Sequence, residues 1–441
     1  MAHDTGSANS NSSNPSPPLS PFQQLPNEML SLIFEPACMD NLIQEYPWPL
    51  FWEEPPTQLT LPAIAYLPAL AISAVCTRWR SLALSSPGIW SQFRLEIAPI
   101  APKPEMMHML NARSGLISTL QLYLDRSADS PLIIDLQTPM GAQSDQSKPS
   151  VLGLLLGHTS RWKTFTYTGD LDLSSCGDLS RPPSFPILED LILRGSDVEI
   201  QDTDLDCFQH APKLRAVKTD ELDRWLSKLP WTQLTSLDVG APRGEDIELL
   251  HQCPSLTVLK LRSFWSKFGP GSVSLAILES FTFIHFTHMD TSRSLETMFS
   301  VFTFPSLGEL IICSEDGSTS NLIWPPDAFS AFISRSACTL TTLSLSRVTI
   351  SDLDLVTTLN LLPSLINFSV DGLVNPEGGS PISFHFLSSL TLHDSGSPLE
   401  LIPKLRFLSI KLHGTEFDDV AFARMVSSRW LPNRTQAAAT G

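Results

Sequence analysis

Few residues of this chain stand in a spacing that supports catalysis. The sequence contains no G-x-x-x-x-G-K-[ST] phosphate loop, no G-x-G-x-x-G nucleotide fingerprint, no G-x-S-x-G nucleophile elbow and no H-E-x-x-H zinc helix. We therefore expect a protein without enzymatic activity and without a cofactor. A hydrolase whose Ser, His and Asp lie far apart in the sequence is the enzymatic alternative, because such triads are recognised by geometry and not by spacing.

One candidate metal site consists of His285, His288 and Asp290, which lie close together in FIHFTHMD. Zinc needs further nitrogen, sulfur or oxygen ligands, and nothing nearby supplies them. We interpret these histidines as ordinary surface or packed residues.

A second candidate begins like a calcium-binding loop, with Asp202, Asp204 and Asp206 at alternate positions. Cys207 stands where such a loop needs glycine, and Lys213 stands where it needs a bidentate glutamate. We predict no bound metal in the chain. We interpret the acidic run over residues 197–206 as a solvated loop, with contact to a basic partner as the alternative.

The net charge and the cysteines limit the partners and the compartment. The chain has 46 acidic and 29 basic side chains and a net charge of -17, which repels nucleic acid and anionic membrane surfaces. Its 7 cysteines form no C-x-x-C pair, and the polar N-terminus lacks the order of a secretory signal. We expect a cytoplasmic or nuclear protein that binds neither nucleic acid nor membrane.

An uncharged stretch over residues 55–77 is long enough to suggest a membrane span. Pro56, Pro62 and Pro68 would interrupt a spanning helix repeatedly, so this stretch predicts soluble helices.

The N-terminal part of the chain predicts a tail followed by two short helices. Residues 1–24 are rich in Ser, Asn and Pro and predict a disordered tail. LPNEMLSLIF then starts a helix at Pro26, with apolar residues sharing one face: Pro26, Met29, Leu30, Ile33 and Phe34. LPALAISAVCTRWRSLALSSP predicts one further helix that ends near Pro87, with a stripe of Ala71, Val75, Trp79 and Leu82.

The longer C-terminal part repeats the unit L-x-x-L-x-L. Candidate units begin at Leu188, Leu214, Leu234, Leu256, Leu278, Leu307, Leu340, Leu365, Leu387 and Leu405. Their spacing brackets the period of roughly 20 to 29 residues of leucine-rich repeats, in which each unit contributes one short strand and a returning segment. Three segments predict helices that return the chain to the next strand, namely EDIELLHQ, DAFSAFISRS and DLDLVTTLNLL. The segment DDVAFARMVSSRW from Asp418 predicts a helix that closes the array.

The segment from Leu25 to Phe93 resembles an F-box, and specifically the F-box-like proteins expanded in mushroom-forming fungi. LPNEMLSLIF is similar to the family's opening L-P-x-E-[IL]-L-x-x-I-F. VCTRWRSLALSSPGIWSQF is similar to its closing V-C-[RK]-x-W-R-x-[IL]-A-x-x-[ST]-P-x-[LI]-W, with Thr77 at the first basic position. Later phrases, including HTSRWKTFTYTGDL and LLHQCPSLTVLKL, resemble the same group.

This resemblance implies an α/β (α+β) chain, with a small helical F-box module followed by an irregular leucine-rich-repeat solenoid. The implied domains are an F-box-like domain over residues 25–95, a repeat domain over residues 96–432 and a flexible tail over residues 433–441. The F-box would dock on a Skp-type adaptor, and through it on a cullin, while the repeats capture a protein substrate. Matching positions assign the adaptor interface, or its support, to Leu25, Pro26, Leu30, Ile33, Phe34, Val75, Cys76, Trp79, Leu82 and Trp90. Several of these must instead fill the module's own core, and we expect Leu30 and Trp79 to serve both roles.

Two features depart from the family pattern. An insertion at about residues 39–67 carries an aromatic cluster over residues 46–52, which either covers the helices or forms a sticky loop. Most repeats also lack the Asn that follows the strand in regular arrays, since Phe264 and Val348 stand in its place. We therefore expect an irregular, loosely curved array.

Residues between the inward leucines should face the inner surface of the array. Asp238, Lys260, Arg262, Ser344 and Ser346 are the candidate substrate contacts. The leading hypothesis is a substrate receptor of a Skp-cullin-F-box ubiquitin ligase. The alternative is a non-catalytic repeat scaffold with no role in ubiquitin transfer, and the sequence does not separate the two.

Overall fold

The computed structural model describes residues 24–44, 67–97, 109–138, 150–169, 183–194, 206–220, 228–240, 246–262, 273–286, 294–314, 322–371, 382–392, 400–411 and 417–430. One parallel sheet runs through the described chain, and every strand in it pairs with its neighbours in chain order. Its 13 strands are β1 (Leu42–Gln44), β2 (Gln92–Glu96), β3 (Leu132–Gln137), β4 (Trp162–Thr168), β5 (Asp190–Arg194), β6 (Ala216–Thr219), β7 (Ser236–Gly240), β8 (Val258–Arg262), β10 (Ser280–His285), β12 (Glu309–Ser314), β13 (Thr342–Ser346), β14 (Asn367–Asp371) and β15 (Phe407–Lys411).

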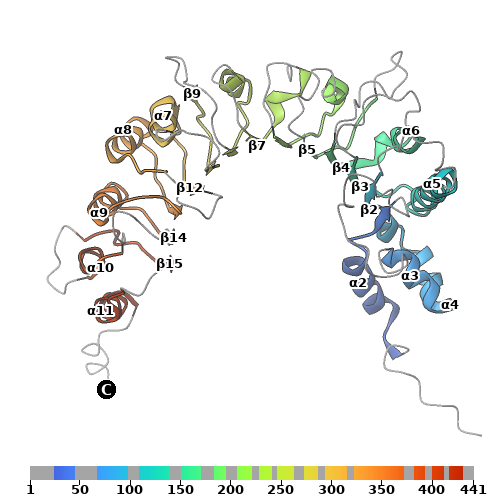
Figure 1. Cartoon of the computed structure of the whole chain (residues 1–441), viewed down its shortest axis with the longest axis horizontal. Coiled ribbons are helices and arrows are strands. Elements are labelled where there is room, and N and C mark those ends of the chain that lie inside the picture. Colours follow the sequence, from blue (N-terminus) through green and yellow to red (C-terminus); the bar gives the residue numbers. More distant parts are fainter. Residues whose placement is uncertain are drawn as a thin grey trace, which may run out of the picture.

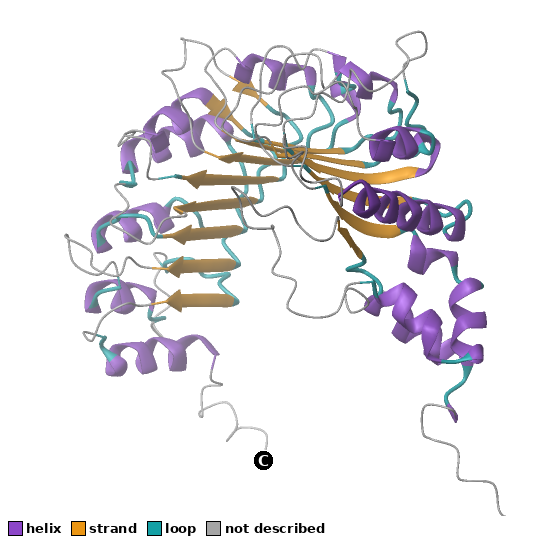
Figure 2. Cartoon of the chain, turned by 45° about the vertical axis from the view of Figure 1, so that its right-hand side comes forward, coloured by secondary structure: helices purple, strands orange, loops and turns teal. Residues whose placement is uncertain are grey.

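The sheet bends into an arch, with the strands along its inner, concave side and the helices along its outer side (Figure 1; Figure 2). The helices are α2 (Asn27–Ala37), α3 (Pro68–Val75), α4 (Thr77–Leu84), α5 (Met109–Arg126), α6 (Ser150–Leu156), α7 (Ser294–Val301), α8 (Pro326–Ser336), α9 (Asp352–Asn360), α10 (Phe384–Leu390) and α11 (Asp419–Trp430). Between β5 and β8 the described outer segments are 3-10 turns, including η6 (Asp206–His210) and η9 (Asp246–Gln252). A second, small parallel pair joins β9 (Val273–Ser274) to β11 (Phe302–Thr303).

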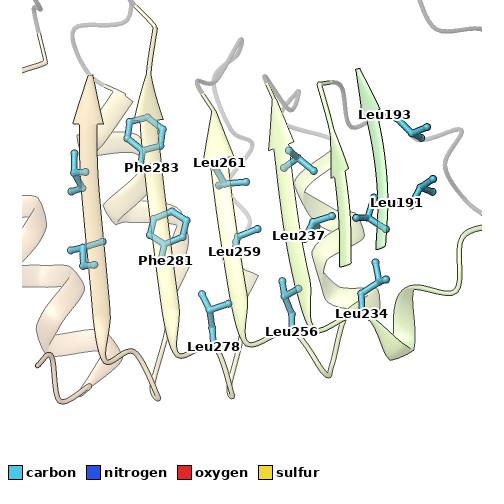
Figure 3. Packing of buried hydrophobic residues seen from close by; sticks show 14 of the residues in the cluster. Leu191, Leu193, Leu234, Leu237, Leu256, Leu259, Leu261, Leu278, Phe281 and Phe283 are labelled. Atoms are coloured by element: carbon cyan, nitrogen blue, oxygen red, sulfur yellow. The ribbon is translucent and has the colours of Figure 1, made fainter. Parts of the chain in front are cut away.

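The sheet exists because each strand alternates apolar and polar residues with a period of two. In β7 and β8, Leu237, Leu259 and Leu261 are buried on the side of the outer segments, as Figure 3 shows. Each unit adds one such strand, and its buried side chains pack against those of the next unit. The buried residues of the repeats therefore form a continuous core.

Nine of the predicted units end in strands of the sheet, β5 to β8, β10 and β12 to β15. The tenth, at Leu387, was predicted wrongly, because Leu387 lies inside α10. There Phe386, Leu387 and Leu390 are buried on one helical face, and the hydroxyl of Ser383 accepts a hydrogen bond from the Phe386 amide (3.1 Å) at the helix start. The sheet also begins earlier than the leucine pattern does, since β1 to β4 precede Leu188.

Three of the four predicted C-terminal helices form, as α8, α9 and α11. EDIELLHQ folds instead as the 3-10 segment η9, so that prediction was wrong in type. The single helix expected before Pro87 is two helices, α3 and α4, because Cys76 between them is extended (φ -160, ψ 171). Its Sγ accepts a hydrogen bond from the Trp79 amide (3.4 Å), so Cys76 starts a new helix.

The N-terminal helices are joined directly to the sheet. β1 lies within the predicted insertion yet pairs with β2, and the domain boundary expected between residues 95 and 96 falls within β2. Residues 46–52 and nearly all of the predicted N-terminal tail lie outside the described residues. Among the described helices, none is both long and apolar enough to cross a membrane.

Candidate functional site

The first candidate surface lies on α2, α3 and α4. Pro26 precedes α2, where its missing amide hydrogen costs nothing, and Leu30 and Phe34 turn inward from the helix. The Phe34 ring packs against Trp79 of α4 with centroids 4.9 Å apart. Arg78 ties α4 to the start of α2, since its Nη2 donates to Asn27 Oδ1 (2.8 Å) and to the Leu25 carbonyl oxygen. The three helices therefore form one packed unit.

The predicted adaptor-binding residues separate into three groups in this unit. Leu30, Phe34 and Trp90 are buried, whereas Leu25, Trp79 and Leu82 are half-buried. Pro26, Ile33, Val75 and Cys76 are exposed. The expectation that Leu30 serves both the core and a partner was wrong, because only 1% of its surface is exposed. Trp79 packs against Phe34 and retains an exposed part, and its role toward a partner stays a prediction.

Large apolar side chains remain exposed on the same helices. Met29, Leu32 and Ile33 share one side of α2 and are 47%, 64% and 47% exposed. Val75, at the end of α3, is 59% exposed, and Leu84 of α4 is exposed as well. These side chains are therefore not needed for the packing of the described fold and make this unit the first candidate for a binding surface.

The second candidate surface is the concave face of the sheet. Asp238, Lys260 and Arg262 occupy strand positions that alternate with the buried leucines, so their side chains lie on the face opposite the outer segments. Register places Lys218, Asp238 and Lys260 side by side on β6, β7 and β8.

Asp238 is the centre of this charged group. Its Oδ1 accepts from Arg262 Nε (2.9 Å), and its Oδ2 lies 3.2 Å from Lys218 Nζ and 3.8 Å from Lys260 Nζ. Arg262 also donates from Nη1 to Asp220 Oδ1 (2.7 Å) and from Nη2 to the Thr219 carbonyl oxygen (3.0 Å). Three cations against two carboxylates leave one net positive charge on β6 to β8.

Gly240 makes the reach of Arg262 possible. It is the register partner of Arg262, and a Cβ at Gly240 would lie 2.0 Å from the Asp220 carbonyl oxygen. Only a residue without a side chain fits between the two strands at this point. The Arg262 guanidinium thus passes over Gly240 and binds Thr219 and Asp220 at the end of β6. Its contact with Asp238 completes a link between β6, β7 and β8.

The C-terminal part of the concave face carries a row of hydroxyl groups and one lysine, Lys411. Register places Ser344 beside Ser369 of β14, and Ser369 beside Ser409 of β15. Ser346 Oγ lies 3.4 Å from Asp371 Oδ2, and Asp371 in turn pairs with Lys411 Nζ (3.3 Å). The predicted contacts therefore belong to two separate patches, one charged and one rich in hydroxyls.

Several polar groups of the inner surface were not foreseen. On β1, β3 and β4, the buried atoms Gln44 Oε1, Asp135 Oδ1 and Thr168 Oγ1 have no hydrogen-bond partner. Burial raises the pKa of the Asp135 carboxyl group, although Arg94, Gln137 and Arg194 act in the opposite direction. Nothing in their local sequence distinguishes these residues, because their surroundings come from strands far apart in the chain.

Of the candidate metal ligands in the sequence, only His285 and Asp206 lie within the described chain. His285 is buried, and its burial lowers its pKa, so it is held as a neutral side chain. His288, Asp290, Asp202, Asp204 and most of the acidic run lie outside the described residues. No group of three or more potential ligands suited to a metal occurs among the residues that the structure describes.

No family model matches the chain, and no curated protein matches it. The functional argument therefore depends on the two surfaces themselves.

Proposed function

We propose that this chain is the substrate-recognition adaptor of a Skp-cullin-F-box ubiquitin ligase. In this proposal α2 to α4 form an F-box-like module that binds a Skp-type adaptor and through it a cullin. The arched sheet is an irregular leucine-rich-repeat solenoid that binds a protein substrate. Ubiquitin transfer takes place on other subunits, in the cytoplasm or the nucleus, and the chain itself needs no cofactor.

The exposed apolar side of α2 is the observation that carries the proposal. Met29, Leu32 and Ile33 contribute nothing to the buried core while Leu30 and Phe34, on the same helix, complete it. A helix that keeps apolar groups on two sides has one side for its own fold and one for a partner. Val75 extends the apolar surface to α3.

The shape of the arch supports separate binding sites for the adaptor and for the substrate. α2 to α4 lie at one end of the sheet, while the concave face runs along the whole array (Figure 1). A partner on the helices leaves the concave strands accessible to a second protein, as an adaptor requires. The charged group around Asp238 and the hydroxyl-rich patch around Ser344 offer polar contacts of different kinds.

The test is co-purification of the full chain with a Skp-type adaptor from the same host. Ile33→Asp and Val75→Asp place a charge on the exposed apolar surface and leave the buried core untouched. Loss of an apolar anchor at such an interface costs about 2 kcal/mol or more, so either variant should reduce adaptor binding by roughly 30-fold or more. Leu353→Asp is the matched control, because Leu353 of α9 is 63% exposed on a distant helix.

Two outcomes would decide between the hypotheses. Stoichiometric binding that is lost in Ile33→Asp and Val75→Asp but kept in Leu353→Asp supports the adaptor. Failure of the wild-type chain to bind, under conditions in which an established F-box protein binds, favours the non-catalytic repeat scaffold with no role in ubiquitin transfer.

A further inference from the structure

The outer helices of the last four units each begin at an exposed apolar side chain. Ile323 lies just before α8 and is 55% exposed, and Leu353 in the first turn of α9 is 63% exposed. Phe384, the first residue of α10, is 58% exposed, and Val420 in the first turn of α11 is 68% exposed. Single exposed apolar residues are common, but these four recur at the same place in successive units. We call them the helix-start row.

Contacts between neighbouring units bring the four helix starts together. A parallel bridge between Ile323 and Thr349 joins the segment before α8 to the segment before α9. Ser383 Oγ, at the start of α10, donates to Asp352 Oδ2 (2.6 Å), at the start of α9. α11 in turn packs against α10, and the four helices follow one another along the outer side of the arch (Figure 1). The helix-start row therefore lies along one edge of the array.

Carboxylates surround the helix-start row. They lie in or directly before the first turns of α8, α9 and α11 and belong to Asp327, Asp352, Asp354, Asp418 and Asp419. Acidic residues stabilise helix starts, which explains their position, yet Asp327, Asp418 and Asp419 remain exposed. Arg347 and Arg424 lie near the same edge, so carboxylates outnumber basic side chains there. This edge repels anionic surfaces and attracts cations.

We propose that the helix-start row binds a basic, amphipathic helix of a partner protein, which lies across the starts of α8 to α11. Packed helices are about 8 to 10 Å apart, and a helix advances about 10.5 Å in seven residues. A partner helix with one apolar residue at every seventh position therefore meets each unit of the row in turn. Lysine or arginine beside those positions faces the carboxylates.

The helix-start row is separate from both surfaces described above. α2 to α4 lie at the other end of the array, and the concave strands lie on the inner side of the arch (Figure 1). A helix bound along the row would leave both surfaces free. The inference does not rest on the proposed ubiquitin-ligase function, and it would remain if no Skp-type adaptor bound.

The test measures binding of three synthetic helical peptides to the full chain by fluorescence anisotropy. The first peptide carries leucine at every seventh position with lysines beside it, over about four heptads. The second replaces each lysine by glutamate, and the third keeps the composition of the first but spaces its leucines so that they no longer share one face. We expect the first peptide to bind at least about tenfold more tightly than either of the others. Its affinity should fall as the salt concentration rises.

Variants of the chain then locate the bound peptide. Leu353→Ser and Phe384→Ser shorten exposed side chains and leave the core intact, and each should weaken the first peptide about tenfold. Phe407→Ser is the matched control for Phe384→Ser, because Phe407 is a phenylalanine that is 69% exposed but lies on the concave side. It should bind the first peptide like wild type. Ile33→Asp should do so as well, since it alters only the proposed adaptor site.

Three results would overturn the proposal. Equal binding of the first and third peptides, or wild-type affinity in both Leu353→Ser and Phe384→Ser, would mean that the acidic chain attracts the peptide without using the row. Equal binding of the first and second peptides would exclude a basic partner. A wild-type chain that is dimeric in analytical ultracentrifugation, with Phe384→Ser monomeric, would assign the row to a second copy of this chain instead.

Discussion

Three helices, α2 to α4, lie at the N-terminal end of the sheet, and one helix, α11, lies at its C-terminal end (Figure 1). The N-terminal end is held by a buried polar residue, Asn41, whose amide group lies within hydrogen-bonding distance of three carbonyl oxygens, those of Cys38 (2.6 Å), Ile89 (3.0 Å) and Gln92 (3.0 Å). The C-terminal end is held by Arg429, which remains half-buried beside partly exposed apolar residues. The N-terminal end is closed by buried polar contacts, whereas the C-terminal end keeps large apolar side chains exposed.

The polar network at the N-terminal end explains why its helices and the sheet form one unit. Asn41 Oδ1 also accepts from the Ala69 amide (3.1 Å) and from Tyr123 Oη (3.0 Å). These contacts connect α2, α3, β2 and α5 through one side chain that has no exposed surface. A network in which every polar group has a hydrogen-bond partner fixes a single arrangement, because any other arrangement leaves a buried polar group without a partner.

The largest effect is therefore expected for Asn41→Leu. Several buried donors and acceptors would lose their partner at once, and each costs about 1 to 3 kcal/mol, so we expect a loss of at least about 4 kcal/mol in unfolding free energy. Chemical denaturation measures the loss, and hydrogen exchange should show faster exchange in α2 to α4.

Asn367→Leu is the matched control for Asn41→Leu. Asn367 lies half-buried on the concave face, where its Nδ2 donates to Thr342 Oγ1 (3.0 Å). We expect a change below about 1 kcal/mol there, because water replaces a lost partner at a half-exposed site. Similar losses in the two variants would contradict the view that Asn41 has a special place in the fold.

The second effect concerns the other end. Arg429→Met keeps an unbranched apolar stem and removes the hydrogen bonds to the Leu390 (2.6 Å), Leu401 (2.6 Å) and Ile402 (3.1 Å) carbonyl oxygens. We expect a loss of about 2 to 3 kcal/mol, measured by chemical denaturation. Hydrogen exchange should place the change in α11 and β15, since units of a repeat array contact only their neighbours. Arg424→Met on the exposed side of α11 should change little, and equal losses in both variants would refute the assignment.

Trp90→Phe tests the aromatic part of the N-terminal closure and should have a smaller effect. The indole Nε1 donates to the Ala83 carbonyl oxygen (2.8 Å), and Arg126 lies 4.4 Å from the ring centroid. Phenylalanine keeps most of the apolar volume and loses the donor, so we expect about 1 to 2 kcal/mol by thermal denaturation. Trp430→Phe at the C-terminal end should stay within about 0.5 kcal/mol, because Trp430 is partly exposed. A larger effect at Trp430 would reverse the comparison between the ends.

The sequence predicted the repetitive strands well because their signal is local. Leu237 and Val239, or Leu343 and Leu345, alternate within one short text, and this period is sufficient to place a strand and its buried face. WKTFTYT of β4 buries Trp162, Phe165 and Tyr167 instead of leucines, so the leucine pattern did not reveal it. LSSLTL matched the pattern, but most of it folded as a helix, because Phe386 before it completes a buried helical face with Leu387 and Leu390.

The site could be predicted only in part, because its contacts are long-range. The concave positions of Asp238, Lys260 and Arg262 followed from strand alternation. The shared carboxylate did not follow, since Lys218 and Arg262 reach it from separate strands. Asn41 lies in a stretch interpreted as an insertion, and its partners Ala69 and Tyr123 are 28 and 82 residues away. Exposure likewise depends on packing, so the sequence did not separate Leu30, which is buried, from Ile33 and Val75 of the same predicted set, which are exposed.

The smallest effect is expected at Asp135 of β3, a partly buried carboxyl group in the N-terminal part of the sheet. Asp135 Oδ1 is buried without a partner, and burial raises the pKa of the carboxyl group above its ordinary value of 3.8. The folded state therefore disfavours the charged form. This cost is fully present at neutral pH, shrinks as the pH falls through the raised pKa of the folded state, and is gone only below 3.8, where the carboxyl group is protonated in both states.

Asp135→Asn removes the charge and keeps the shape. At neutral pH we expect a gain in unfolding free energy below about 1 kcal/mol, since the side chain is partly exposed and water and the nearby arginines reduce the cost. The gain should shrink as the pH is lowered. Denaturation of wild type and variant at several pH values measures both trends, with Asp371→Asn as the control, because Asp371 is paired with Lys411. A loss of stability at neutral pH in Asp135→Asn would mean that Arg94 and Arg194 stabilise the carboxylate by more than its burial costs.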